Sequence, residues 1–99
     1  MFGSDMLAKL TEMKRIAEES KERLNHLLVE GEAGSGLVVV TMTGNREVRG
    51  VKINTDLKMM EPEDLEDLLC VAIKRALDKA NALNEQEVVS SAKNFFPGT

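Results

Sequence analysis

Residues 28–54 read LVEGEAGSGLVVVTMTGNREVRGVKIN, and this stretch decides the fold of the 99-residue chain. It is rich in valine and threonine and punctuated by glycines, a composition that favours short strands over a helix. The pair Gly44-Asn45 predicts a two-residue hairpin turn, because both residues tolerate the positive φ angles of primed turns. We therefore predict a three-stranded antiparallel meander with strands at Leu28–Ala33, Leu37–Thr43 and Arg46–Asn54.

The middle strand is apolar on both faces. Side chains alternate between the two faces of a strand, so Leu37 and Val39 share one face and Val38, Val40 and Met42 share the other. Neither face carries the polar side chains expected on a side that faces solvent. We therefore expect one face to meet the helices and the other to meet a second molecule. The residues predicted at this dimer interface are Val38, Val40, Met42, Leu68 and Val71.

A long amphipathic helix precedes the strands. From Asp5 to Leu28, apolar residues recur at spacings of three and four, with Ser20 in one slot, as on one face of a helix; they are Met6, Leu10, Met13, Ala17, Leu24 and Leu27. Such a helix would extend about 36 Å, whereas a globule of this size has a radius of gyration of about 13 Å. Part of the helix must therefore protrude or pack against another chain.

A second long helix follows the strands and begins at Pro62, a residue that suits the first helical position. Acidic residues in its first turns are favoured by the helix dipole. The run Leu68–Ile73 is apolar on every side, which predicts burial on every side. We expect the helix to continue through the eighties, and a single domain over residues 1–99 with flexible tails at 1–4 and 95–99.

The composition limits the class of protein. The chain has 13 lysine and arginine residues against 17 aspartate and glutamate residues, a formal net charge of −4, and one cysteine, Cys70. A single cysteine forms no internal disulfide and no cysteine zinc site, which fits a reducing compartment. No apolar run approaches the roughly 18 residues of a membrane span, and the first ten residues lack the pattern of a signal peptide. We expect a cytoplasmic protein that contacts no membrane.

The glycines do not form a nucleotide-binding loop. Gly31 and Gly36 have the GxxxxG spacing, but Leu37 and Val38 stand where the lysine and hydroxyl residue of a phosphate loop belong. A β-turn or bulge explains these glycines better.

Catalytic and metal-binding residues are not indicated either. His26 has no partners for a nitrogen or sulfur metal site, and Cys70 among leucine and valine is typical of a small buried hydrophobe. The carboxylates from Glu61 to Asp67 suit the start of a helix better than an acid–base pair. We predict neither an enzyme nor a bound cofactor or metal.

Helix, three-stranded meander and helix in an acidic, aromatic-poor chain resemble the YbaB/EbfC family of bacterial nucleoid-associated proteins. The similarity covers nearly the whole chain. It is carried by Met1-Phe2-Gly3, by the block from Val29 to Asn54, by EDLEDLLCVAIKRALDKA at Glu63–Ala80 and by Phe96-Pro97-Gly98. The first helix departs from the Gln/Met/Lys-rich version of many members, since its charges are mixed.

The resemblance implies an α+β homodimer with packed sheets, whose projecting helices bind or bridge duplex DNA in the nucleoid with little sequence specificity and regulate gene expression. We expect phosphate contacts from Lys9, Lys14, Arg15, Lys79 and Lys93 at the free tips, with Lys21 and Arg23 secondary. No segment is a basic patch, so composition alone favours the alternative of a dimeric scaffold for a protein partner such as a recombination or replication factor. A small-ligand cleft has no convergent polar groups to support it.

Overall fold

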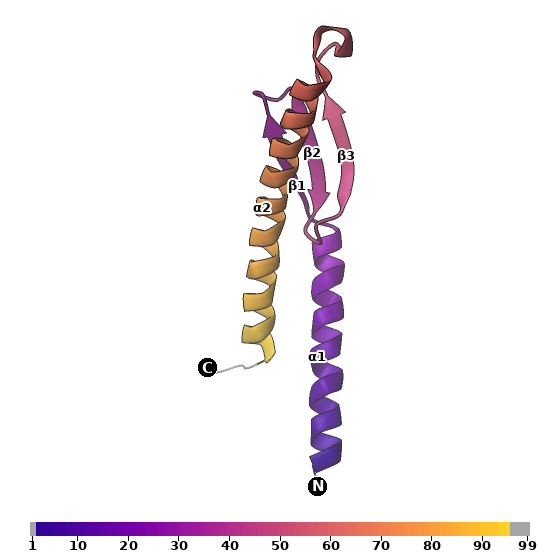
Figure 1. Cartoon of the computed structure of the whole chain (residues 1–99). Helices are drawn as coiled ribbons and strands as arrows, with labels where there is room; N and C mark the ends of the chain where they lie inside the picture. Colours follow the sequence, from indigo (N-terminus) through magenta and orange to yellow (C-terminus); the bar gives the residue numbers. More distant parts are fainter. Residues whose placement is uncertain (1, 96–99) are drawn as a thin grey trace.

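The computed structural model describes residues 2–95 and measures 70 × 22 × 19 Å, with a radius of gyration of 19.2 Å. The long helix α2 runs along a small sheet, and the long helix α1 extends away from the lower end of that sheet (Figure 1). The elements in chain order are α1 (Phe2–Asn25), β1 (Leu28–Ala33), β2 (Val38–Thr43), β3 (Val48–Ile53), a short 3-10 helix η1 (Leu57–Met59) and α2 (Pro62–Phe95). The α+β class and the order of elements are confirmed, and α1 protrudes as its length predicted.

The helix ends differ from the sequence prediction. α1 begins at Phe2 and ends at Asn25, three residues earlier than expected at both ends, because Leu28 already belongs to β1. The expected tail at residues 1–4 is helical from Phe2 onwards, and α2 begins at Pro62 as predicted and includes Phe95. Met1 and residues 96–99 lie outside the described residues. None of the helices within residues 2–95 combines the length and apolar character needed to span a membrane.

The strands form one antiparallel sheet in the order β1-β2-β3. Ala33 pairs with Val38 across the first hairpin, and the second pairing shifts register at Thr41/Met42. Gly34, Ser35 and Gly36 all have positive φ angles, and the Leu37 N–H donates to the Gly34 carbonyl at 3.3 Å. This hydrogen bond closes a β-turn, as predicted. Glycine suits the segment because it adopts positive φ angles without steric strain.

The predicted two-residue turn at Gly44-Asn45 is wrong. The loop has three residues, and the positive φ of 67° lies at Arg46. The Thr43 hydroxyl accepts from the backbone N–H groups of Asn45 and Glu47, both at 3.2 Å. The Thr43 N–H also donates to the Glu47 carbonyl at 2.8 Å. These bonds hold a turn followed by a left-handed residue, the usual three-residue hairpin loop.

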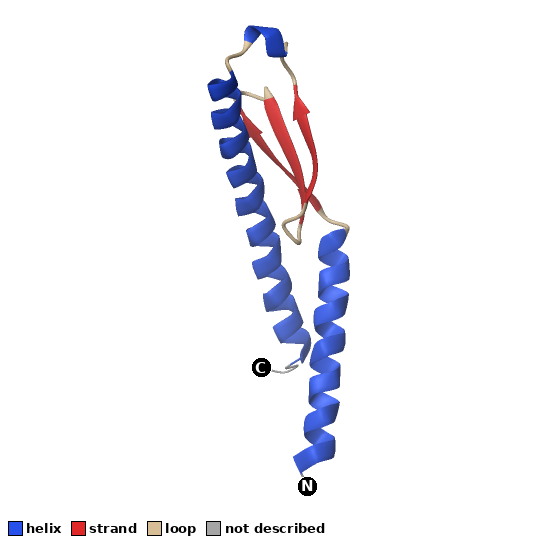
Figure 2. Ribbon diagram, turned by 45° about the vertical axis from the view of Figure 1, so that its right-hand side comes forward, coloured by secondary structure: helices blue, strands red, loops and turns tan. Residues whose placement is uncertain are grey.

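The core lies between α2 and one face of the sheet (Figure 2). Ala72, Ala76 and Ala80 follow one another at four-residue spacing along α2 and are fully buried. Across from them, the core residues of β1 and β2 are Ala33, Val38, Val40 and Met42. Small side chains on α2 let the helix approach the sheet closely, most of all at Gly31, where a Cβ atom would lie 2.9 Å from the Ala76 Cα atom.

This packing corrects the predicted dimer interface. Val38 and Val40 have no exposed surface, and Met42 is 2% exposed, because α2 of the same chain covers them. They are unavailable to a second molecule. Leu68 also packs partly on this core, while Val71 is 41% exposed. Burial of α2 on every side is likewise wrong, since only the side that faces the sheet is covered.

Candidate nucleic-acid interface

α1 and the end of α2 form an arm that extends away from the sheet. The two helices run antiparallel, and α1 continues beyond the end of α2 (Figures 1 and 2). Leu24 anchors the base of the arm, where it is 5% exposed and its carbonyl accepts from the Gly44 N–H at 3.0 Å. We call residues 2–15 of α1 together with residues 91–95 of α2 the arm tip.

The arm tip is the basic end of an acidic chain. It contains Lys9, Lys14, Arg15 and Lys93 against Asp5 and Glu12, a local charge of +2. Since the whole chain carries −4, everything else carries −6. Lys9, Lys14 and Lys93 are exposed, and within residues 2–95 none of them forms an ion pair.

The opposite end is strongly acidic. Residues 56–67, which cover η1 and the first turns of α2, contain six acidic residues and one lysine. This acidic end and the arm tip lie at the two ends of the 70 Å long axis (Figure 1). A polyanion therefore meets attraction at one end of the molecule and repulsion at the other.

Two of the predicted DNA-binding arginines are engaged in ion pairs. Arg15 binds both Glu12 and Glu19 on its own helix, the latter at 2.5 Å. The hydrogen bond from Arg15 lowers the pKa of Glu12, and the two carboxylates raise the pKa of Arg15. Arg23 reaches across to Glu87 on α2, with Nε at 2.8 Å from the carboxylate, and this bond lowers the pKa of Glu87. Arg23 therefore joins the two helices of the arm.

Lys79 lies away from the tip, contrary to the prediction. Its Nζ atom donates to the Glu30 carbonyl of β1 at 2.7 Å, and Arg75 donates to the Glu32 carbonyl, also at 2.7 Å. Both cations cross from α2 to the edge strand β1, because α2 runs directly over the sheet. Lys21 lies near the base of the arm, where its carbonyl accepts from the Asn45 side chain at 2.9 Å.

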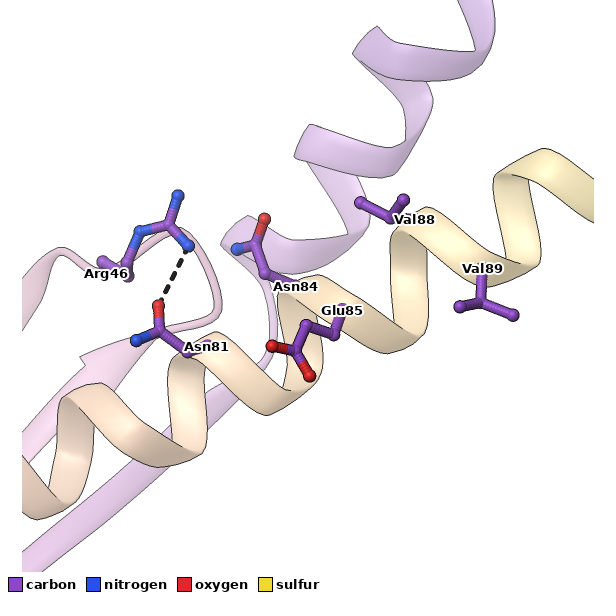
Figure 3. A pocket seen from close by; sticks show the side chains of 6 residues that line it. All are labelled: Arg46, Asn81, Asn84, Glu85, Val88 and Val89. Atoms are coloured by element: carbon purple, nitrogen blue, oxygen red, sulfur yellow. Dashed lines mark hydrogen bonds between the residues drawn. The ribbon is translucent and has the colours of Figure 1, made fainter.

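Two further arginines lie beside the base of the arm and were not predicted. Arg46 donates to Asn81 at 3.2 Å (Figure 3), and Arg49 donates to Asn25 at 3.3 Å. A shallow hollow of about 570 Å³ lies here and is lined by Arg46, Asn81, Asn84, Glu85, Val88 and Val89. In the sequence, these arginines are three positions apart beside a hairpin. That spacing does not show that their side chains reach the two helices.

Two residues with reactive side chains, His26 and Cys70, both lie at the surface. His26 is exposed and contacts Glu22 at 3.1 Å. Cys70 is exposed rather than buried as predicted, because it projects from the side of α2 opposite the alanines at 72 and 76. No group of three or more metal-ligating side chains occurs in the part of the chain that the structure describes.

The chain is similar to known proteins both in sequence and in fold. Residues 2–95 match the model of the YbaB/EbfC DNA-binding family. A "Nucleoid-associated protein" of Flavobacterium johnsoniae is 34% identical over 93% of this chain and 86% of its own length. One from Acinetobacter baumannii is 38% identical over 88% of this chain and 82% of its own. The crystal structure of an uncharacterized Helicobacter pylori protein has the same fold, with a TM-score of 0.75 at 22% identity, over 94% of this chain and 96% of that one.

Proposed function

Because the chain belongs to the YbaB/EbfC DNA-binding family, we propose that it is a nucleoid-associated protein that holds duplex DNA at its arm tip. Membership of a DNA-binding family also fits the expectation that the chain is not an enzyme. The observation that carries the proposal is the local charge of +2 at the arm tip in a chain of charge −4. Lys9, Lys14 and Lys93 are the residues that we assign to phosphate contacts.

The charge distribution supports end-on binding. DNA binding without strict sequence preference depends on neutralising phosphates, so the protein needs exposed cations that are not already paired. Lys9, Lys14 and Lys93 meet this need, whereas Arg15 and Arg23 are held by glutamates. The acidic end would be repelled by the duplex, which orients the rod with its arm toward DNA.

We propose that a second copy covers an apolar patch beside α2. α2 lies over β1 and β2, which leaves the same face of β3 open, with Val48 52%, Val51 49% and Ile53 36% exposed. By helical spacing, Leu69, Ile73 and Leu77 lie on the side of α2 opposite Arg75 and Lys79, and therefore toward β3. We call Val48, Val51, Ile53 and Ile73 the β3 patch, and it replaces the buried Val38, Val40 and Met42 as the dimer surface.

A dimer would carry two arms. Two arm tips contact DNA at two places, so a dimer is able to bridge two duplexes or bend one, and to influence expression of nearby genes in the bacterial nucleoid. Each arm contributes few phosphate contacts, and joining two arms raises the effective affinity without any new contact.

DNA binding is tested by fluorescence anisotropy with a random-sequence duplex as salt is raised. The arm variant carries Lys14→Glu and Lys93→Glu, one substitution on each helix of the arm. The matched control carries Lys58→Glu and Lys74→Glu, which change the net charge equally but lie outside the tip. Losing one phosphate contact at each of the two positions should weaken binding by roughly 60-fold at about 0.1 M salt, and should make the slope of log K against log salt shallower by about 2.

We expect the affinity of the control variant for the duplex to stay close to that of the native chain, and the affinity of the arm variant to fall well below both. Equal weakening of both variants would place the effect in net charge rather than in the arm tip, and would overturn the assignment. Absence of binding by the native chain even at low salt would favour a protein partner instead.

The dimer is tested by light scattering with two neighbouring substitutions. Val51→Glu places a charge on the β3 patch and should give a folded monomer, whereas Lys52→Glu, on the other face of β3, should leave a dimer. A native chain that is monomeric, or a Val51→Glu variant that remains dimeric, would contradict the proposed surface.

A further inference from the structure

The arm tip carries an apolar stripe between two lysines. Met6, Leu10 and Met13 are 58%, 57% and 50% exposed and recur at spacings of four and three, so they lie along one side of α1. At 3.6 residues per turn, Lys9 and Lys14 lie on opposite flanks of this stripe, each about 70° from its centre. Apolar side chains in a row on a protruding helix favour coverage by another apolar surface. The lysines favour a surface that is also acidic.

The basic flanks disfavour a symmetric contact between two arm tips. Two stripes packed face to face would bring the lysines of one copy against those of the other, and like charges repel. The acidic residues of the tip, Asp5 and Glu12, do not offset this repulsion, because they lie more than about 100° from the centre of the stripe. The surface that complements the stripe is therefore apolar, acidic and different from the stripe itself.

The acidic end of the same molecule has these properties. Leu57 and Met59 of η1 are 57% and 84% exposed. They lie within residues 56–67, whose six acidic residues and one lysine give a charge of −5. η1 is held in place, since the Asp56 carboxylate accepts from the Lys58 N–H and the Met59 N–H donates to the Asp56 carbonyl, both at 2.9 Å. Exposed apolar side chains on a fixed turn bind with little further loss of conformational freedom.

We propose that the acidic end of a second copy docks on the stripe of the arm tip. Charge complementarity is the main argument, because a tip of charge +2 meets an end of charge −5, and each side brings exposed apolar side chains. The two surfaces lie at opposite ends of the 70 Å axis (Figure 1), so one copy can use both at once. A contact between two different surfaces repeats from copy to copy and builds a linear chain of molecules.

The contact covers the part of the arm tip that we assign to DNA. Lys9 and Lys14 flank the stripe, so a copy held in this way does not present these two lysines to a duplex. This consequence rests on the proposed function. The contact between copies does not, and it is therefore tested without DNA.

The test is a complementation experiment followed by light scattering. The tip variant carries Leu10→Glu, which places a charge in the stripe, and the end variant carries Met59→Lys, which removes an apolar side chain and part of the acidic charge from the other end. Ala8→Glu is the matched control, because it adds the same charge as Leu10→Glu but on the opposite side of α1. Circular dichroism checks that each variant is folded. Contacts of small area are weak, so the protein is measured up to about 1 mM.

The mean mass of the native chain should rise with protein concentration. Its association constant should fall at least tenfold between about 0.1 and 1 M sodium chloride, because screening shortens the range of charge interactions. The tip variant alone and the end variant alone should each keep the mass of the smallest species, whether that is a monomer or the proposed dimer. Their equimolar mixture should associate again, because each variant keeps the surface that the other lacks. The Ala8→Glu control should associate as the native chain does.

Several outcomes overturn the proposal. A native mass that does not change with concentration shows that copies do not associate in this way. An end variant that associates by itself assigns the contact to two arm tips, and a tip variant that associates by itself shows that the stripe is not used. A mixture that does not recover association shows that the tip and the acidic end are not partners, and leaves the stripe to another protein. Loss of association in the Ala8→Glu control places the effect in net charge instead of the stripe.

Discussion

Replacing Gly31 with alanine should destabilise the protein severely. At this position α2 crosses β1 so closely that an added Cβ atom would lie 2.9 Å from the Ala76 Cα atom, and closer still to the Ala72 carbonyl oxygen and the Ala76 nitrogen. Each of these is a backbone atom, so no side-chain rotation relieves the overlap. α2 would have to move off the sheet and loosen the core that Ala72 and Ala76 form with β1 and β2.

The magnitude follows from the kind of contact. Overpacking of a core by flexible side chains costs typically 1–3 kcal/mol, and a backbone clash belongs at about the upper end, near 3 kcal/mol. For a domain of this size, about 1 kcal/mol shifts the melting temperature by roughly 4–8 °C. Gly31→Ala should therefore lower the melting temperature by about 12–24 °C, unless the variant fails to fold.

Gly50→Ala is the matched control. It makes the same chemical change in β3, where no atom lies within 4 Å of the added Cβ, and surface changes of this kind usually stay within about 0.5 kcal/mol. Thermal unfolding is followed by circular dichroism at 222 nm and at one protein concentration, because melting of an oligomer depends on concentration. Similar melting temperatures for Gly31→Ala and Gly50→Ala would refute the close crossing of α2 over β1.

Two further predictions concern side chains in the second half of α2. Ser91→Ala should raise the free energy of unfolding, measured by urea denaturation, by about 0.5–1 kcal/mol. The reason is that the Ser91 hydroxyl is buried without a hydrogen-bond partner among the described residues. A loss of stability would show that the hydroxyl has a partner. Glu87→Gln should cost about 0.5–1 kcal/mol at neutral pH, since Arg23 is half-exposed. Arg23 lowers the pKa of Glu87 from its ordinary 4.5, so this stabilisation is complete above that value and is lost as pH falls through the lowered folded pKa. A stability difference between native chain and Glu87→Gln that persists undiminished in strong acid would contradict the ion pair.

The sequence predicted the helices and strands correctly, but it did not predict which of them pack against one another. Alternation along β2 correctly placed Val38, Val40 and Met42 on one face, and the helical period correctly identified α1. Periodicity shows which residues share a face but not what covers it, so these residues were assigned to a dimer instead of to α2. The information needed was that Gly31 and the alanines at 72 and 76 allow a close crossing, and this depends on their meeting in space.

The candidate site shows the same limit. Arg15 and Glu19 are four residues apart, a spacing typical of an ion pair on one helix face, and the structure pairs them. Arg23 instead pairs with Glu87, and Lys79 with a β1 carbonyl, because helix packing brings distant residues together. Turn propensity alone also missed the hydrogen bonds of the Thr43 hydroxyl, which select the longer hairpin loop.

The cations of α2 on β1 set a limit on how many copies can assemble through this sheet. An exposed edge strand is a template for addition of further strands, and chains with two open edges can grow without end. Lys79 and Arg75 occupy carbonyls of the edge strand β1, whereas every residue of the other edge strand, β3, is exposed. If β3 paired along its edge with β3 of a second copy, the joined sheet would have no open edge left, and growth along it would stop at two chains rather than continue as a filament.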